Sequence, residues 1–281
     1  ESMRFDIDVG GLVINYNDSA MDSVAKIVVN YQQAGLFLVG KSASDIYTAS
    51  LNSESSYTSF ILEHEPFQWI WPFSILNVSV VVTIRTDIIY EINASTTTGG
   101  VELTVPSGVT VGNIRLISTT GGVAVNTAEN STFQGDLLTQ TITGGISILA
   151  NSANFTSGVN AKIITGGLTM NFTNCIFGGN IVGDVTTGGI DLKIFNPEYT
   201  QDSQLNFGST TGGIDIEIYQ YKPTGANITG QLTVTTGGID LLYEDNQASV
   251  GARFFGTTTT GGVDLTNLGG FTQIGNEILE S

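Results

Sequence analysis

Four aspartates recur at nearly equal intervals in the second half of the chain, and their spacing makes them the best candidates for shared chemistry. Each stands in the same place of a repeated unit, after two glycines and an aliphatic residue. Carboxylate oxygens are the ligands that Ca²⁺ prefers, and grouped carboxylates also move protons in enzymes. We therefore expect either a candidate Ca²⁺ site or a solvated acidic stripe. The four are Asp191, Asp215, Asp240 and Asp264.

Other catalytic groups are scarce. The single histidine, His64, lies outside the repeats, so no Ser-His-Asp set is expected. Cys175 is the single cysteine, which excludes an internal disulfide, and the two apolar residues that follow it indicate a buried thiol. Lys193 and Glu217 hold the same repeat position one coil apart, which predicts an exposed ion pair of little energetic consequence. We expect no enzyme and no cofactor beyond the candidate Ca²⁺, with a β-helical polysaccharide-acting enzyme as the minor alternative.

A repeated Gly-Gly pair positions these aspartates. Thr precedes every pair, an aliphatic residue follows it, and the pairs are 22 to 25 residues apart, the length of one structural coil. Paired glycines fit a corner that needs positive φ or close backbone packing, and the Thr column could form a hydroxyl ladder between stacked coils. The first glycines are Gly99, Gly121, Gly144, Gly166, Gly188, Gly212, Gly237 and Gly261.

The residues after each pair show which side chains enter the core. The first and third are aliphatic in every repeat, as in Ile190 and Leu192, and the second is polar or small. Successive side chains of a strand face opposite sides, so the second residue points outward. A second strand precedes each corner, as in Ile114-x-Leu116. These patterns predict an all-β, β-helix-like β-solenoid of about eight 22–25-residue coils. The alternative, a β-sandwich, would need turns every 8–12 residues or so.

The chain divides into three regions. Residues 1–95 form an irregular N-terminal β region, in which Gly10-Gly11 fits a degenerate first coil continuous with the solenoid. Residues 96–268 carry the repeats, and residues 269–281 form a C-terminal tail.

An aromatic insertion, Glu65–Phe73, interrupts the N-terminal region and contains both tryptophans. It fits either a plug over the solenoid end or an exposed apolar patch for a partner. The apolar run that continues to Ile84 is broken by polar residues and is no convincing membrane span.

The amino-acid composition limits the classes of partner that we expect the chain to bind. Only 12% of residues are charged and the net charge is −17, with nine Lys and Arg scattered along the chain. Nucleic acid and anionic lipid are therefore disfavoured, because both require clustered cations. The chain begins at Glu1, which fits a mature exported protein as well as a shortened one.

Asn-x-Ser/Thr sequons support an extracellular location and predict N-linked glycans. Several fall in outward positions or in variable connections, where a glycan would not disturb the fold. The sequons are at Asn17, Asn77, Asn93, Asn130, Asn154, Asn171 and Asn227.

The Thr-Thr-Gly-Gly-Ile-Asp-Leu unit, preceded by a Val/Ile-rich strand such as Leu76–Ile84, resembles the putative-adhesin family of bacterial and archaeal surface β-solenoids. The similarity covers residues 76–268. The resemblance implies a cell-surface location and adhesion, and it implies no roles for individual residues.

Two functions follow as expectations. The first is an extracellular structural protein, a subunit of a filament or coat in which copies of the chain join through β-strand contacts. In that case the run Met3–Val9 or the tail from Phe271 to Leu279 would add a strand to a neighbouring copy, unless each tail folds back as its own cap. The second is an adhesin that binds surface glycans or other cells.

Overall fold

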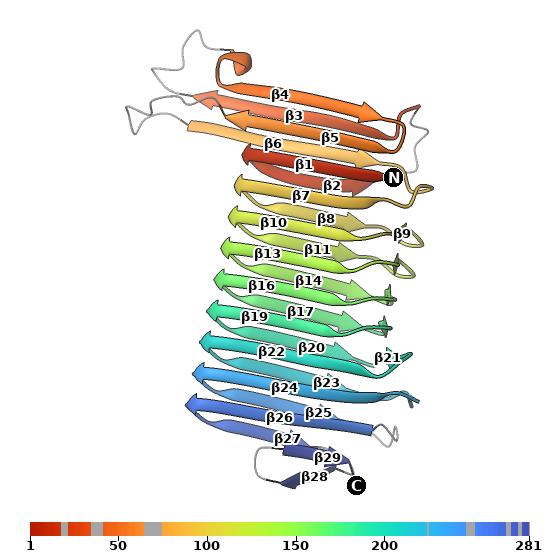
Figure 1. Ribbon diagram of the computed structural model, residues 1–281, viewed down its shortest axis with the longest axis vertical. Helices are drawn as coiled ribbons and strands as arrows, with labels where there is room; N and C mark the ends of the chain where they lie inside the picture. Colours follow the sequence, from red (N-terminus) through yellow and green to blue (C-terminus); the bar gives the residue numbers. More distant parts are fainter. Residues whose placement is uncertain are drawn as a thin grey trace.

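The computed structural model is an all-β rod of stacked coils (Figure 1). It describes residues 1–17, 22–34, 42–64, 75–223, 225–245, 251–267, 271–274 and 277–280. The one helix in these ranges, η1 (Ala43–Asp45), has three residues, so the described chain holds no helix that could cross a membrane. The predicted β-solenoid is confirmed.

Three sheets run along the rod. Sheet A contains β1 (Ser2–Val9), β4 (Tyr47–Glu54), β5 (Tyr57–His64), β7 (Glu91–Thr98), β10 (Ile114–Thr120), β13 (Leu137–Thr143), β16 (Val159–Thr165), β19 (Ile181–Thr187), β22 (Ser203–Thr211), β24 (Asn227–Thr236), β26 (Gly251–Thr260), β28 (Phe271–Ile274) and β29 (Glu277–Glu280). Sheet B contains β2 (Gly11–Tyr16), β3 (Ala25–Ala34), β6 (Ile75–Ile84), β8 (Val101–Val105), β11 (Val123–Thr127), β14 (Ile146–Asn151), β17 (Leu168–Thr173), β20 (Ile190–Phe195), β23 (Ile214–Tyr219), β25 (Ile239–Glu244) and β27 (Val263–Asn267). Sheet C contains β9 (Thr110–Val111), β12 (Thr132–Phe133), β15 (Asn154–Phe155), β18 (Ile176–Phe177) and β21 (Glu198–Tyr199).

Each predicted coil is a strand of sheet A followed, after the Gly-Gly corner, by a strand of sheet B. Neighbouring coils pair in parallel and in register, so that Thr187 lies beside Thr165 on one side and Thr211 on the other. Seven full turns of the chain separate the corner at Gly99 from the corner at Gly261.

The inward columns of the sheets form one continuous core, as the alternation predicted. Ile190 and Leu192 are buried while Asp191 between them is exposed. Sheet C was not predicted, because its two-residue strands lie in the variable connections. It adds a buried stack of rings whose neighbouring centroids lie 4.8 to 5.7 Å apart, formed by Phe133, Phe155, Phe177 and Tyr199.

The corner between sheets A and B accepts only glycine at its first position. The eight first glycines have φ between 133° and 145°, and a Cβ there would overlap the backbone of the preceding coil's first glycine. The backbone is also closed by hydrogen bonds, as where Gly99 N–H donates to Thr120 O at 2.7 Å. The hydroxyls that bridge coils here belong to an inward column two residues before the Thr column: Ser118 and Thr141 donate to the carbonyls of Gly99 and Gly121 at 2.8 and 2.9 Å.

The N-terminal coils do not follow chain order. The coil β1–β2 lies between β7–β8 and the later coil β5–β6, and β4 and β3 are antiparallel strands at the end of sheets A and B. The expectation that Met3–Val9 is available to a neighbouring copy is therefore wrong, because β1 has a partner strand on both sides. The insertion Glu65–Phe73 connects β5 to β6 and lies outside the described residues.

The C-terminal end of the rod is stepped. In sheet A, β29 pairs antiparallel with β26 and β28 pairs with β29, so the tail folds back as a cap on its own chain. In sheet B the last strand is β27, which pairs with β25.

Candidate functional site

The four predicted aspartates form a ladder on the outer face of sheet B. Parallel pairing places Asp215 between Asp191 and Asp240, and Asp264 follows on β27. Paired positions of neighbouring parallel strands are about 5 Å apart, so like charges face one another. Partial burial and then the charges of Asp240 and Asp191 raise the pKa of the Asp215 carboxyl above its usual value.

A groove of about 660 Å³ runs beside this ladder. It exists because the second glycine of each corner has no side chain, while the aspartate two residues later projects outward. Gly213, Gly238 and Asp215 are among the residues that line it. In the part of the chain that the structure describes, no group of three or more His, Cys, Asp or Glu side chains is arranged to hold a metal ion. The Ca²⁺ site therefore stays a prediction.

The ion pair predicted beside the ladder is present. Lys193 Nζ lies 2.5 Å from Glu217 Oε2, and both side chains are partly exposed. The hydrogen bond between them raises the pKa of Lys193 and lowers the pKa of Glu217. Tyr219 completes the group, because its hydroxyl donates to the same Glu217 oxygen at 3.0 Å.

An exposed aromatic cluster next to this ion pair escaped the sequence analysis. Phe195 and Tyr219 are paired on β20 and β23, and Tyr221 follows two residues later. The ring centroid of Phe195 lies 6.0 Å from that of Tyr219 and 5.3 Å from that of Tyr221. The signal was available, because Phe195 and Tyr219 are each the sixth residue after their Gly-Gly pair, which is the third outward position of the alternation.

The remaining reactive groups are accounted for structurally. Cys175 is buried, as predicted, and burial raises the pKa of its thiol to about 11, so it stays protonated at neutral pH. His64 ends β5, where its backbone N–H donates to Asp8 Oδ2 at 3.4 Å and its ring packs 5.4 Å from that of Tyr47.

Six of the seven sequon asparagines have exposed side chains, and Asn154 is half-buried. The side chain of Asn227 is held in place, since its Nδ2 donates to Asp202 Oδ1 at 3.2 Å. This exposure is compatible with the glycosylation prediction and does not test it.

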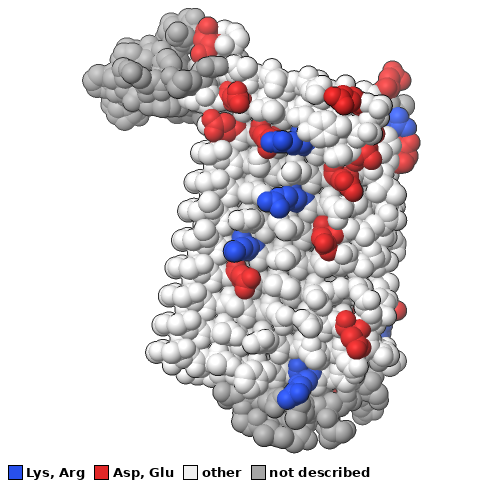
Figure 2. Space-filling view, in the orientation of Figure 1, with Lys and Arg blue, Asp and Glu red and all other residues white. Residues whose placement is uncertain are grey.

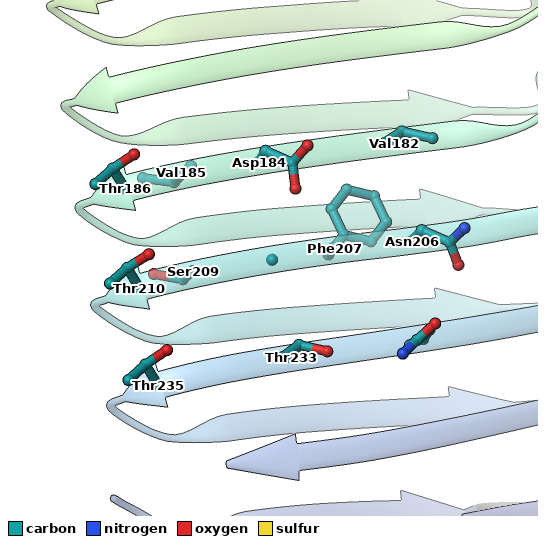
Figure 3. Close-up of a pocket in the computed structure, with 12 residues that line it drawn as sticks. Val182, Asp184, Val185, Thr186, Asn206, Phe207, Ser209, Thr210, Thr233 and Thr235 are labelled. Carbon is teal, nitrogen blue, oxygen red and sulfur yellow. The ribbon is translucent and has the colours of Figure 1, made fainter. Parts of the chain in front are cut away.

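The outer face of sheet A carries few charges (Figure 2). A shallow hollow of about 410 Å³ opens on it over β19, β22 and β24 (Figure 3). Gly208 creates the hollow, because it stands in register between Asp184 and Thr233 without a side chain of its own. Its polar lining consists of neutral hydroxyl and amide groups apart from Asp184, and apolar side chains such as Val182 complete it.

Comparison with known proteins identifies no family. No protein-family model matches the chain, and no curated protein is similar in sequence. One solved structure, a putative cell adhesion protein from Clostridium sporogenes, aligns with 76% of this chain and 91% of its own at 11% identity, with a TM-score of 0.37. Similarity at this level establishes neither a shared family nor a shared function, so the resemblance to surface adhesins stays a prediction.

Proposed function

We propose that the chain is an extracellular structural protein, a subunit of a glycosylated cell-surface filament or coat whose copies join through the edges of their sheets. The observation that supports this is the N-terminal end of the rod, where sheets A and B end level with each other in β4 and β3 (Figure 1). Among the described strands, β4 pairs with β5 alone and β3 with β6 alone. The outer edge of each strand offers N–H and C=O groups to another chain.

The side chains of these edge strands favour association. Val28 and Val29 on β3 are 39% and 40% exposed, and Leu51 on β4 is 64% exposed. Natural edge strands are usually short, twisted or rich in charge, which prevents such pairing. Here β3 is ten residues long with Lys26 as its one charged residue.

A second copy of the chain fits this end by symmetry. A two-fold axis perpendicular to the sheets would pair β3 with β3 of the second copy and β4 with β4, both antiparallel, and would continue both sheets across the contact. A filament needs a second contact at the other end, where β27 is the last strand of sheet B and β28 the last of sheet A.

Variants of the edge residues test the proposal. We expect the wild-type protein to form dimers or longer particles in light scattering and negative-stain images, and the double variant V29K/L51K to remain monomeric, because the added charges would be buried at the contact. F255K is the matched control, since Phe255 is 47% exposed on β26, which has a partner strand on each side and lies far from β3 and β4. A wild-type protein that stays monomeric at high concentration, or a double variant that assembles normally, would contradict the proposal.

Glycosylation is a separate part of the proposal. Glycans at the exposed sequons would block sideways contacts between rods and leave their ends free. We expect the intact mass of native protein to exceed the 29.6 kDa of the polypeptide. A mass equal to the polypeptide would remove glycans from the proposal and weaken the extracellular assignment.

The proposal includes no catalytic activity. The carboxylates that could act together, those of the aspartate ladder, lie in the open on a strand face. Release of reducing ends or unsaturated sugars from a polysaccharide panel would contradict this part.

A further inference from the structure

The aromatic cluster on sheet B departs from the pattern of its own column. The third outward position after the corner is Asn151 on β14, Thr173 on β17 and Glu244 on β25, but Phe195 on β20 and Tyr219 on β23. The aromatic residues are thus confined to two adjacent coils. Neighbouring coils show that the fold does not require rings at this position.

Two of these rings are also unusually accessible. Phe195 is 39% exposed and Tyr221 is 37% exposed, while Tyr219 is half-buried between them and the ion pair. The stacked rings of sheet C, such as Phe133, Phe155 and Phe177, are fully buried, and Phe255, which is 47% exposed on sheet A, has no described ring beside it. An exposed cluster of large apolar side chains with a polar rim is typical of a binding surface.

The polar rim consists of groups that are already oriented. Glu217 Oε2 receives hydrogen bonds from Lys193 and Tyr219, and Lys193 Nζ also lies 5.4 Å from the centre of the Tyr219 ring. These contacts fix the Tyr219 ring and leave the remaining Lys193 hydrogens and Glu217 Oε1 as a donor and an acceptor beside the rings. A ligand for this surface needs an apolar face and hydrogen-bonding groups at its edge.

A pyranose ring has both properties. One face of the sugar presents C–H groups that stack on aromatic rings, and its equatorial hydroxyls donate and accept hydrogen bonds in the ring plane. The aspartate ladder lies on the same sheet face, so acidic sugars would be repelled. Sheet B continues on both sides of the cluster, with β17 beside β20 and β25 beside β23, so further sugars of a chain can lie over neighbouring coils.

We propose that Phe195, Tyr219 and Tyr221, with Lys193 and Glu217, form a binding site for the pyranose rings of a neutral polysaccharide. The rings stack on the sugar face, and the ion pair binds its hydroxyls. This site is independent of the edge strands β3 and β4, so binding and assembly can be tested separately. It also supplies what the adhesin alternative requires.

The test is calorimetric titration of the full chain with cellohexaose, mannohexaose, chitohexaose and, as an acidic counterpart, oligogalacturonate. We expect at least one neutral oligosaccharide to bind and oligogalacturonate to bind at least tenfold more weakly. The variants F195A and Y221A should each lower the affinity for the neutral ligand at least tenfold. Both replaced side chains are exposed, so the variants should fold, which their thermal melts will verify.

Phe255→Ala is the control, because this exposed ring lies on sheet A, away from the cluster. The variant Y219F separates stacking from hydrogen bonding, since it keeps the ring and removes the hydroxyl that holds Glu217. Lack of binding to all three neutral ligands would overturn the proposal. So would binding that survives F195A and Y221A, or that falls equally in F255A. Binding of a peptide in place of every sugar would also overturn it.

Discussion

Each of the central coils has two corners with positive φ, and the two use different residues. At the corner between sheets A and B, φ is near 140° and the residue is always glycine. At the corner between sheets B and C, φ lies between 51° and 59°, and the residues are Asn130, Ser152, Asn174 and Asn196. The second value belongs to the left-handed region, which Asn tolerates, whereas the first is open only to glycine. Close stacking of coils adds a second restriction, because at the first corner a Cβ would also strike the backbone of the preceding coil.

The side chains that stack from coil to coil near the two corners also differ, in the hydrogen-bonding groups that they carry. Asn196 Nδ2 donates to Asn174 Oδ1 at 2.7 Å, because an amide has both a donor and an acceptor and can bond to a copy of itself. The aspartates that follow the glycine corner have acceptors only, so they repel one another when ionised. Identical residues stacked coil upon coil therefore stabilise or destabilise the rod according to their hydrogen-bonding groups.

The largest effect is expected when each of the two glycines of one corner is replaced by alanine in turn. Gly188→Ala should lower the free energy of unfolding by at least about 4 kcal/mol or prevent folding, because its Cβ would overlap Gly166 O. Gly189→Ala should leave the stability unchanged or raise it by up to about 1 kcal/mol, since the nearest atom to its Cβ would be Gly213 O at 3.7 Å. Chemical denaturation of both variants is the measurement. Similar losses in the two would show that the corner does not discriminate its glycines.

A smaller effect is expected at the other corner. Ser152 is the member of its column that is not Asn, so Ser152→Asn should raise the free energy of unfolding by about 0.5–1 kcal/mol, because Asn tolerates the left-handed region better. Asn174→Ala should lower it by about 1–2 kcal/mol, since it removes the hydrogen bond from Asn196 and places alanine in that region. Thermal melts compare both with wild type. A less stable S152N variant would show that backbone conformation does not select this residue.

The smallest effect is expected in the aspartate ladder. The pKa of Asp215 is raised in the folded state, so its protonated form stabilises the fold below the usual Asp pKa of about 3.9, and this stability is lost as the pH rises through the raised value. At pH 7 the free energy of unfolding of the Asp215→Asn variant should therefore exceed that of wild type by less than about 1 kcal/mol, and its melting temperature should be slightly higher. The difference should vanish near pH 3.

Calcium can be added to the same experiment. If the ladder binds Ca²⁺, the wild-type melting temperature should rise with Ca²⁺ and that of D215N should rise less. Wild-type midpoints that do not change with Ca²⁺ or between pH 4 and pH 7 would leave the solvated stripe as the role of the ladder.

The coils could be predicted from the repeated sequence because the steric and burial requirements around each corner involve residues that are close together in the chain. The steric demand at a position such as Gly188, and the alternation of Ile190 and Leu192 around Asp191, are visible within a few residues. The pair Lys193 and Glu217 was predictable for the same reason, since equal positions in stacked coils become neighbours.

Features whose signal in the sequence is weak or ambiguous were missed. The third sheet was hidden in two-residue strands, although its aromatic residues from Phe133 to Tyr199 recur every 22 residues. The aromatic cluster was missed because rings such as Tyr221 look in sequence like core residues. The placement of β5–β6 outside β1–β2 depends on pairing between distant segments that carry no repeat.

That placement constrains how the chain folds as it leaves the ribosome. When β1 and β2 emerge, neither of their neighbours in the sheets exists yet, and contacts such as Ser95 Oγ to Asp6 Oδ1 join residues 89 positions apart. A coil without neighbours has nothing to stack on, and closing such long loops slows folding. Strands β1 and β2 must therefore wait for both the inserted coil and the first regular repeat. The regular repeats, in contrast, each dock on a coil that has just been completed. Strands β1 and β2 thus stay without their full set of partners while the chain up to β8 is made, and chaperone binding would have that time to act on them.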